Sequence, residues 1–323
     1  MTSARFAEIT GRYPTLRIGV VGDFCLDRYL EIDPDRPETS IETGLPVYNV
    51  TRVRSQPGAA GTIVNNLVAL GVGQISPVGF CGEDGEGWEL LRALRGVRGV
   101  SLEHFIQTPE RATFTYTKPM LAGRELSRLD IKNWTPTPAS LGARLAEKVR
   151  ALDVDAIVVM DQVSIDETGV VTGPVLAAIA AANPRLPILA DSRRSLRDFP
   201  AVILKMNADE LAALTGTASG EAASALALAR ERGRPVIVTL AERGLLGALP
   251  DGEVVSVPAW PVRGEIDVVG AGDSVTANAV AALAAGATLA ETLAIANAAA
   301  SIVVHQLGTT GTATAAEIAA VLR

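Results

Sequence analysis

Hydrophobic residues along the chain follow two alternating patterns. Short, nearly continuous apolar runs predict strands that are buried on both faces of a sheet. Between these runs, apolar residues recur every three or four positions, as at Ile63, Leu67 and Leu70, which is typical of helices with one buried face. The predicted strands span 17–22, 75–80, 156–160, 187–191, 201–205 and 235–240, and the predicted helices 58–70, 141–152, 172–182, 221–232, 274–285 and 289–304. This alternation predicts an α/β fold: a doubly wound, mostly parallel sheet with helices on both faces and ligands at the carboxyl ends of the strands.

Two segments depart from this alternation and predict strands outside the main sheet. Residues 28–53 contain several prolines and then a strand-like run at 46–53. Residues 104–133 contain Phe114 and Tyr116 alternating with threonines, the period-two pattern of a strand. We expect both to form a small inserted β lid over the active face, which would exclude water. Because no Pro/Gly linker divides the chain, residues 1–323 are expected to form a single domain.

Composition and charge exclude several classes of function. The 36 acidic and 29 basic residues give a net charge of -7, which argues against a nucleic-acid partner. Two cysteines and two histidines are too few for a closed zinc site, and Cys25 and Cys81 are expected to be free, buried packing residues. The apolar tract 277–304 contains Glu291 and Asn297 and predicts two alanine-rich helices, not a membrane span. Without a signal-peptide pattern, a cytoplasmic protein is expected.

The clearest chemical signal is the segment Asp267-Val-Val-Gly-Ala-Gly-Asp273, which leads into a predicted helix. Small residues at 270–272 let backbone N–H groups converge on one spot, and the helix dipole adds positive potential there. Such a cradle suits a phosphate or a developing oxyanion. Asp273 lies beside it and is placed to accept a proton from a hydroxyl. This segment alone leaves open the alternative of a glycine-rich turn in which Asp273 caps the helix.

Further motifs make the chain similar to the PfkB/ribokinase family of carbohydrate kinases. The family's C-terminal signature, an Asp, two residues and Gly-Ala-Gly-Asp, stands at 267–273. The first signature helix corresponds to 57–71, the Asn-x-x-Glu motif to 207–210 and the nucleotide-edge turn to 238–244. Within the family, the chain most resembles the heptose-phosphate kinase domain of ADP-heptose biosynthesis. The runs that carry this closer likeness are 22–29, 127–130 and 289–308.

The resemblance implies a ribokinase-like, ATP-dependent phosphotransferase that acts on a hydroxyl of a sugar or sugar phosphate, with a heptose-phosphate-like substrate among the candidates. Asp273 would be the general base, and the backbone of Gly270, Ala271 and Gly272 would form the anion hole. Phosphoryl transfer is catalysed mainly by positioning and charge neutralisation, which these groups and Mg²⁺ supply. The family also implies a homodimer formed through the lid, whose strands expose edges.

The resemblance assigns further residues to the two substrates. On the donor side, Asn207 and Glu210 would organise Mg²⁺ and the phosphates through water. The residues expected along the nucleotide are Thr239, Arg243 and Gly244, with Asn297 near the adenine. The residues expected to bind the acceptor are Asp27, Gly58, Thr62, Arg128 and Asp161. A solvated loop carboxylate is an equally weighted interpretation of Asp161. Basic side chains that are candidates for gripping a substrate phosphate are Arg128, Lys132, Arg193 and Arg194.

Several positions depart from the family pattern. Thr62 replaces a sugar-binding Asn and offers a hydroxyl instead of a two-pronged amide. Ala59 and Ala241 stand where the family commonly has Gly, and Lys205-Met206 stands where Thr-Pro often precedes the Asn. Valines at 268 and 269 replace residues that commonly include Thr or Ser, so a monovalent cation beside Asp267 would depend on carbonyl oxygens.

Two other classes of function were weighed against a kinase. A dinucleotide-dependent oxidoreductase shares the fold type, but the first strand is not followed by Gly-x-Gly-x-x-Gly. The substitutions at Thr62 and Val269 keep open a catalytically silent family member that binds nucleotide or sugar. The intact Asp273 favours the kinase.

Overall fold

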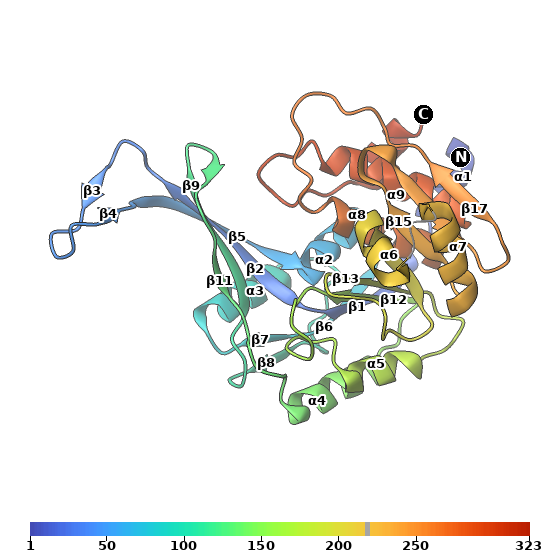
Figure 1. Cartoon of the computed structure of the whole chain (residues 1–323), viewed down its shortest axis with the longest axis horizontal. Helices are drawn as coiled ribbons and strands as arrows, with labels where there is room; N and C mark the ends of the chain where they lie inside the picture. Colours follow the sequence, from blue (N-terminus) through green and yellow to red (C-terminus); the bar gives the residue numbers. More distant parts are fainter. Residues whose placement is uncertain (217–219) are drawn as a thin grey trace.

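A central eight-stranded sheet runs through the molecule in the order β17-β16-β15-β14-β13-β12-β1-β6 (Figure 1). The structure is a computed structural model and describes residues 1–216 and 220–323. Parallel pairing joins β1 (Arg17–Gly22), β6 (Gln74–Val78), β12 (Ala156–Asp161), β13 (Ile188–Ser192), β14 (Ile203–Asn207) and β15 (Val236–Thr239). The antiparallel strands β16 (Leu245–Ala248) and β17 (Val254–Val257), which the sequence pattern did not predict, complete one edge. The predicted mostly parallel sheet is confirmed.

Helices cover both faces of this sheet, as predicted. One face packs against α2 (Ala60–Ala69), α8 (Ala271–Ala284) and α9 (Leu289–Val303), with α1 (Ser3–Thr10), α3 (Gly85–Arg95) and α10 (Ala315–Val321) beside them. The other face packs against α4 (Ala139–Arg150), α5 (Gly173–Ala180), α6 (Ala208–Thr215) and α7 (Glu221–Arg232).

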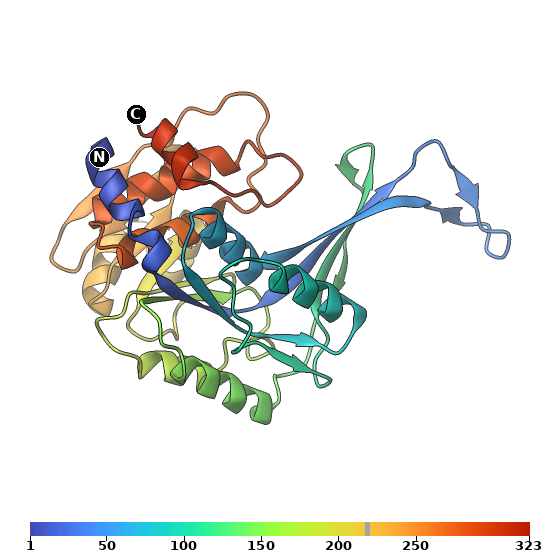
Figure 2. The ribbon, with the colours of Figure 1, turned by 180° about the vertical axis from the view of Figure 1, so that it is seen from behind.

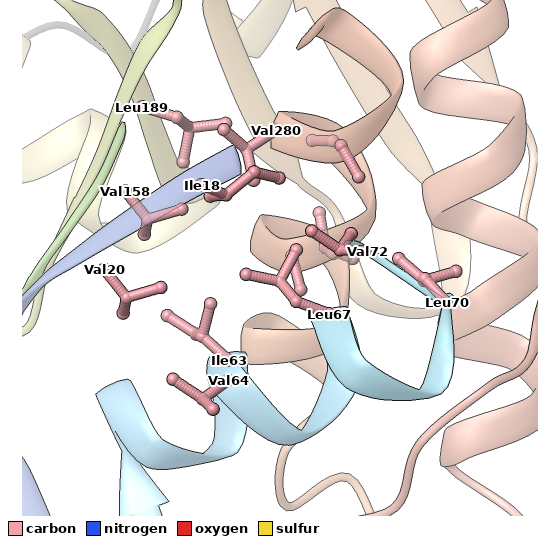
Figure 3. Packing of buried hydrophobic residues seen from close by; sticks show 14 of the residues in the cluster. Ile18, Val20, Ile63, Val64, Leu67, Leu70, Val72, Val158, Leu189 and Val280 are labelled. Atoms are coloured by element: carbon pink, nitrogen blue, oxygen red, sulfur yellow. The ribbon is translucent and has the colours of Figure 1, made fainter. Parts of the chain in front are cut away.

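Alternating side chains of the strands supply both hydrophobic cores. In β1, Val20 belongs to the core on the α2 side and Val21 to the core on the other side. Figure 3 shows Ile63 and Leu67 of α2 directed toward β1, with Val280 of α8 nearby. The apolar tract 277–304 lies in α8 and α9, and among the described residues no helix is long and apolar enough to cross a membrane. Both cysteines are free and buried, as expected.

The predicted lid is a second sheet that projects from the body (Figures 1 and 2). Its order is β10-β9-β2-β5, with β11 paired to β9. The strands are β2 (Phe24–Ile32), β5 (Val50–Ala59), β9 (Phe114–Leu121), β10 (Arg124–Glu125) and β11 (Leu129–Ile131). A two-stranded hairpin of β3 (Glu38–Thr39) and β4 (Pro46–Val47) forms the far tip.

Three predicted boundaries were wrong. The lid begins at Phe24 instead of residue 28, because the chain passes from β1 into β2 almost without interruption. The strand expected at 46–53 is split between β4 and β5. Because β5 continues to Ala59, the helix expected to begin at residue 58 begins at Ala60. The strand expected at 75–80 breaks at Gly79, where a Cβ would lie 2.8 Å from the carbonyl oxygen of Gly22. Beyond the break, β7 (Phe80–Gly82) pairs with β8 (Ile106–Thr108).

The junction between the two sheets is fixed by Asp23, a buried residue between β1 and β2. Its Oδ1 accepts a hydrogen bond from the backbone N–H of Val170 (2.7 Å). Its Oδ2 accepts hydrogen bonds from the N–H groups of Gln162 (2.8 Å) and Val163 (3.2 Å). A carboxylate that accepts several backbone N–H groups satisfies its buried charge locally. Asp23 therefore ties the base of the lid to the loop that follows β12.

Two of the departures from the family pattern fall at unusual backbone conformations. Ala59 has φ 52° where β5 meets α2, and Ala241 has φ 51° just after β15. Positive φ favours glycine because a Cβ crowds the backbone there. The family's preference for Gly at these two positions thus has a backbone reason, and this chain retains the strain.

We predict that Ala241→Gly leaves the free energy of unfolding unchanged or raises it by up to about 1 kcal/mol. Ala241 is exposed, so relief of the positive φ outweighs or balances the greater freedom of Gly in the unfolded chain. The matched control is Ala143→Gly, at an exposed position inside α4, which should lose about 1 kcal/mol. Urea denaturation of both variants measures the difference, and equal losses would contradict the strain at Ala241.

Candidate functional site

The N-terminus of α8 forms the predicted cradle. Gly270 caps the helix with φ 84°, and the backbone N–H of Ala271 donates to the carbonyl of Val268 (3.2 Å). Because the first N–H groups of a helix have no intrahelical partner, those of Gly272 and Asp273 remain for a ligand. Asp267 holds the turn in place: its Oδ1 accepts from Val269 N (3.0 Å) and its Oδ2 from Gly308 N (3.1 Å).

Asp273 lies in the first turn of α8, where its environment favours a neutral carboxyl. Burial, the largest effect, and the negative charges of Asp191 and Asp27 raise the pKa of Asp273, while the positive charges of Lys205 and Arg193 lower it. The resulting pKa is about 7. A carboxylate with a pKa near neutrality is suited to general-base catalysis.

A buried ion pair lies under the cradle. Lys205 Nζ is 2.7 Å from Asp191 Oδ2, and both residues are almost fully buried at neighbouring positions of β14 and β13. The same carboxylate oxygen accepts a hydrogen bond from Thr276 Oγ1 of α8 (3.2 Å). Asp191 therefore joins two strands to the helix that carries Asp273.

Above the cradle, four polar residues form one cross-strand row of the lid. The register pairs Gln56 of β5 with Asp27 of β2, Asp27 with Tyr116 of β9, and Tyr116 with Asp130 of β11. Cross-strand neighbours project to the same face, so these side chains line one surface. Burial raises the pKa of the Asp27 carboxyl.

Gly58 lies next to this row. A Cβ at Gly58 would lie 2.4 Å from Asp27 Oδ2, so the absence of a side chain leaves room for that carboxylate. Thr62, in the first turn of α2, is buried, and its hydroxyl has no hydrogen-bond partner among the described residues. An orphaned buried hydroxyl is available to a ligand, and its contact with an acceptor stays a prediction.

A pocket of about 260 Å³ opens beside the row, between the lid and the loop after β12. The basic candidates Arg128, Lys132 and Arg193 all line it. Asp130 is within 3.3 Å of Arg128 and 3.2 Å of Lys132, and both cations lie against the Tyr116 ring. Three cations against one carboxylate leave an excess of two positive charges, which suits a doubly charged anion.

Asp161 is not a loop residue in the structure: it belongs to β12 and forms an ion pair with Arg194. Asp161 ends β12 with a fully buried carboxylate, so the interpretation as a solvated loop residue was wrong. Its Oδ2 accepts from Ser192 Oγ (2.7 Å) and from Arg194 (3.1 Å), which also pairs with Asp166. Burial raises the pKa of Asp161 to about 7. Arg194 is thus engaged within the protein, whereas its neighbour Arg193 is exposed and faces the pocket.

The residues expected on the donor side lie at the same carboxyl edge of the sheet, further along it, at the ends of β14 and β15. Asn207 ends β14 next to Thr239 of β15, and it forms a capping box with Glu210: each side chain accepts the other's backbone N–H at 2.8 Å. No described residue donates to the second oxygen of Glu210, Oε1, which leaves it for a hydrated cation. Among residues 1–216 and 220–323, no group of three or more His, Cys, Asp or Glu side chains could hold a metal ion by itself.

Three further donor-side residues have structural partners. Arg243 forms an ion pair with Glu221 (2.7 Å), and Asn297, buried in α9, donates to the carbonyl of Pro258 (2.7 Å). Gly244 has φ 96°, and a Cβ there would lie 2.0 Å from the carbonyl oxygen of Val257. Their contacts with a nucleotide stay predictions.

The sequence pattern gave no role to Lys205, Asp191 or Gln56, which the structure places at the site. Gln56 bonds to the 308–311 loop: it donates to Thr310 Oγ1 (2.8 Å) and accepts from Thr309 (3.1 Å). Asp191 ends a strand at the carboxyl edge of the sheet, which is a signal for a site residue. Nothing in the sequence pairs it with Lys205.

Comparisons with known proteins identify the family and the fold. The sequence matches the pfkB family carbohydrate kinase pattern over residues 22–316. It is 36% identical over 315 residues to the bifunctional protein HldE of Azorhizobium caulinodans, covering 94% of this chain and 64% of that protein. The chain thus spans just under two thirds of the length of this relative.

Solved structures share the fold. The ribokinase of Arabidopsis thaliana complexed with ribose and ATP superposes with a TM-score of 0.72 at 21% identity, covering 95% of this chain and 99% of that one. A ribokinase II from Escherichia coli in complex with ATP and Mg²⁺ gives a TM-score of 0.70 at 18% identity, covering 95% and 99%. The ribokinase-like fold expected from the sequence is confirmed.

We predict that the carboxyl of Asp273 titrates near pH 7 in the folded protein. NMR of ¹³C-labelled aspartate measures this, with Asp273→Asn identifying the resonance. Asp191→Asn should lower the pKa, because it removes a nearby negative charge and leaves Lys205 uncompensated. Asp251→Asn, on an exposed turn, is the control and should leave the titration unchanged. A titration of Asp273 near the ordinary value of 3.8 would contradict the description of its environment.

Proposed function

Because the chain belongs to the pfkB family of carbohydrate kinases, we propose that it transfers the γ-phosphoryl group of ATP to a hydroxyl of a sugar or sugar phosphate, with Asp273 as the general base. The observation that carries this proposal is the position of Asp273. It lies in the first turn of α8 beside the N–H groups of the cradle, and the charges of Lys205, Arg193 and Asp27 act on its carboxyl.

The reaction requires few covalent changes. The acceptor hydroxyl gives its proton to an Asp273 carboxylate oxygen, and its oxygen forms a bond to the γ-phosphorus. The bond from that phosphorus to the β–γ bridging oxygen breaks, and ADP leaves with the electron pair. The N–H groups of Gly272 and Asp273 would stabilise the charge on the transferring group. The protein's task is therefore positioning, proton acceptance and charge neutralisation.

For the donor, we propose that ATP lies along the ends of β14 and β15, near Asn207 and Thr239. Arg243 and Gly244 would follow the nucleotide, with Asn297 near the adenine. The similar structures include complexes with ATP, which supports ATP as the donor. The free Oε1 of Glu210 fits a cation that keeps its waters, as Mg²⁺ does. Bound with ATP, Mg²⁺ would neutralise phosphate charge.

Around this core we make three further proposals. A monovalent cation would bind near Asp267 through carbonyl oxygens. The chain would work in the cytoplasm, where ATP is available.

The chain would form a homodimer through the lid, because β5 is an edge strand and carries exposed apolar side chains. The exposed apolar residues of this arm are Ile41, Leu45, Tyr48, Val50 and Val53.

For the acceptor, we propose a sugar that already carries a phosphate, as in a heptose phosphate. The reacting hydroxyl would lie between Asp27 and Asp273, close to Gly58 and Thr62. The existing phosphate would occupy the pocket lined by Arg128, Lys132 and Arg193, whose excess positive charge matches a phosphate dianion. Asp161 would affect the position of the acceptor indirectly, because it holds Arg194 in an ion pair.

We predict that Asp273→Asn lowers kcat by about 10²–10⁴-fold, because Asn cannot accept the proton. ATP affinity and melting temperature should change little, since Asn preserves the size of the side chain and tolerates the first helical turn. ADP release is measured over a panel of sugars and sugar phosphates, with Asp251→Asn as control. Near-native kcat in the Asp273 variant would refute the mechanism. A wild-type chain that binds ATP but turns over no acceptor would instead support the silent-binder alternative.

We also predict that Arg193→Ala raises KM about tenfold to a hundredfold for a phosphorylated acceptor. For the same sugar without phosphate KM should change little, because the lost contact is to the phosphate. Arg128→Ala should behave in the same way. Arg124→Ala is the control, since Arg124 is exposed on β10 and does not line the pocket. Equal effects on both acceptors would exclude this pocket as the phosphate site.

A further inference from the structure

Lys205 is a buried cation that the proposed mechanism has not yet used. It lies near the carboxyl end of β14 with 6% of its surface exposed. An ammonium group has three N–H donors and stays charged inside a protein only when they find partners. In the part of the chain that the structure describes, Asp191 Oδ2, at 2.7 Å, is the one acceptor bonded to Nζ. Donor capacity therefore remains on Nζ.

The free side of this ammonium faces the cradle. If Gly272 carried a Cβ, that atom would lie 3.2 Å from Lys205 Nζ, and Lys205 is its one neighbour within 4 Å. Gly272 thus leaves open the space between the start of α8 and the lysine. The charge of Lys205 also acts on Asp273, whose pKa it lowers. An oxygen atom placed above Gly272 would meet the ammonium and the helix N–H groups together.

The pair with Asp191 explains how the cation is held in this place. Asp191 Oδ2 accepts from both Lys205 and Thr276, so the lysine is braced against α8 as well as β13. A flexible lysine loses much side-chain freedom when it is fixed in this way. Pre-organised charge of this kind acts where negative charge develops during a reaction.

On the basis of the proposed function, we propose that Lys205 contacts the transferring phosphoryl group and donates hydrogen bonds to its non-bridging oxygens. It would be a catalytic residue that completes the cradle on the side opposite the helix. It moves no proton: Asp273 takes the proton of the acceptor, and Lys205 remains an ammonium ion throughout. A lysine in place of the common Thr at this position then contributes to catalysis.

The competing explanation is purely structural, with Lys205 serving only as counter-ion to Asp191. A double-mutant cycle separates the two roles. Lys205→Met alone leaves Asp191 buried without its counter-ion and is expected to lose stability. Lys205→Met combined with Asp191→Asn removes both charges, so no unpaired charge is left buried in the folded protein. Lys148→Met, on the surface of α4, is the matched control.

In the double variant we expect a melting temperature close to wild type and a fall in kcat of about 100-fold or more. The KM for the acceptor should stay within about threefold, because the contact forms mainly with the transferring group. ADP should bind as in wild type, whereas the affinity for ADP with aluminium fluoride and acceptor, a mimic of the transition state, should fall. A double variant that folds and loses less than about 100-fold in kcat would overturn the proposal.

A measurement on the wild-type chain covers the case in which neither variant folds. The Nζ resonance of Lys205, followed by NMR, should shift on addition of ADP, aluminium fluoride and acceptor, and much less with ADP alone. An unchanged resonance would overturn the proposal. These results are distinct from failure of the proposed function, in which the wild-type chain itself transfers no phosphoryl group to any acceptor.

Discussion

The carboxylate of Asp23 is the interaction on which the geometry of the site most depends. It lies where the first strand of the main sheet becomes the first strand of the lid, and it binds three backbone N–H groups of the loop after β12. That loop lines the basic pocket, and β2 carries Asp27. One buried side chain thus holds in a fixed relation the two surfaces that would enclose the acceptor under the proposed function. Its close neighbour Gly169, where a Cβ would lie 2.4 Å from Asp23 Oδ1, shows how tightly the loop packs on it.

A second theme is that two buried carboxylates form ion pairs with cations from other segments of the chain. Asp161 at the end of β12 binds Arg194, and Asp191 at the end of β13 binds Lys205 of β14. Buried pairs contribute little net stability, because desolvation offsets much of the attraction. They do fix where each charge lies. Here they place cations at the carboxyl edge of the sheet, around a carboxyl group whose own pKa is held near neutrality.

Local patterns were sufficient to predict the parallel sheet, the helices on both faces and the lid. Apolar runs and helical spacing are written in consecutive residues, as in the α2 face of Ile63 and Leu67. Asn207 and Glu210 could also have been read from sequence as a capping box, since Asn followed three residues later by Glu is its signature. Boundaries failed where tertiary contacts decide them. The strand break at Gly79 lies where the chain passes close to the carbonyl of Gly22, and the contact of Lys205 with the space above Gly272 joins residues that no local pattern relates.

Gln56 links the two surfaces that the proposed function assigns to the acceptor and the nucleotide. It stands in the cross-strand row beside Asp27, and its amide exchanges hydrogen bonds with Thr309 and Thr310. The loop that holds these threonines is in turn bound through Gly308 to Asp267, at the start of the anion cradle. A displacement of β5 is therefore carried to the turn before α8. Linkage makes such coupling symmetrical in free energy: whatever factor the nucleotide imposes on acceptor affinity, the acceptor imposes on nucleotide affinity.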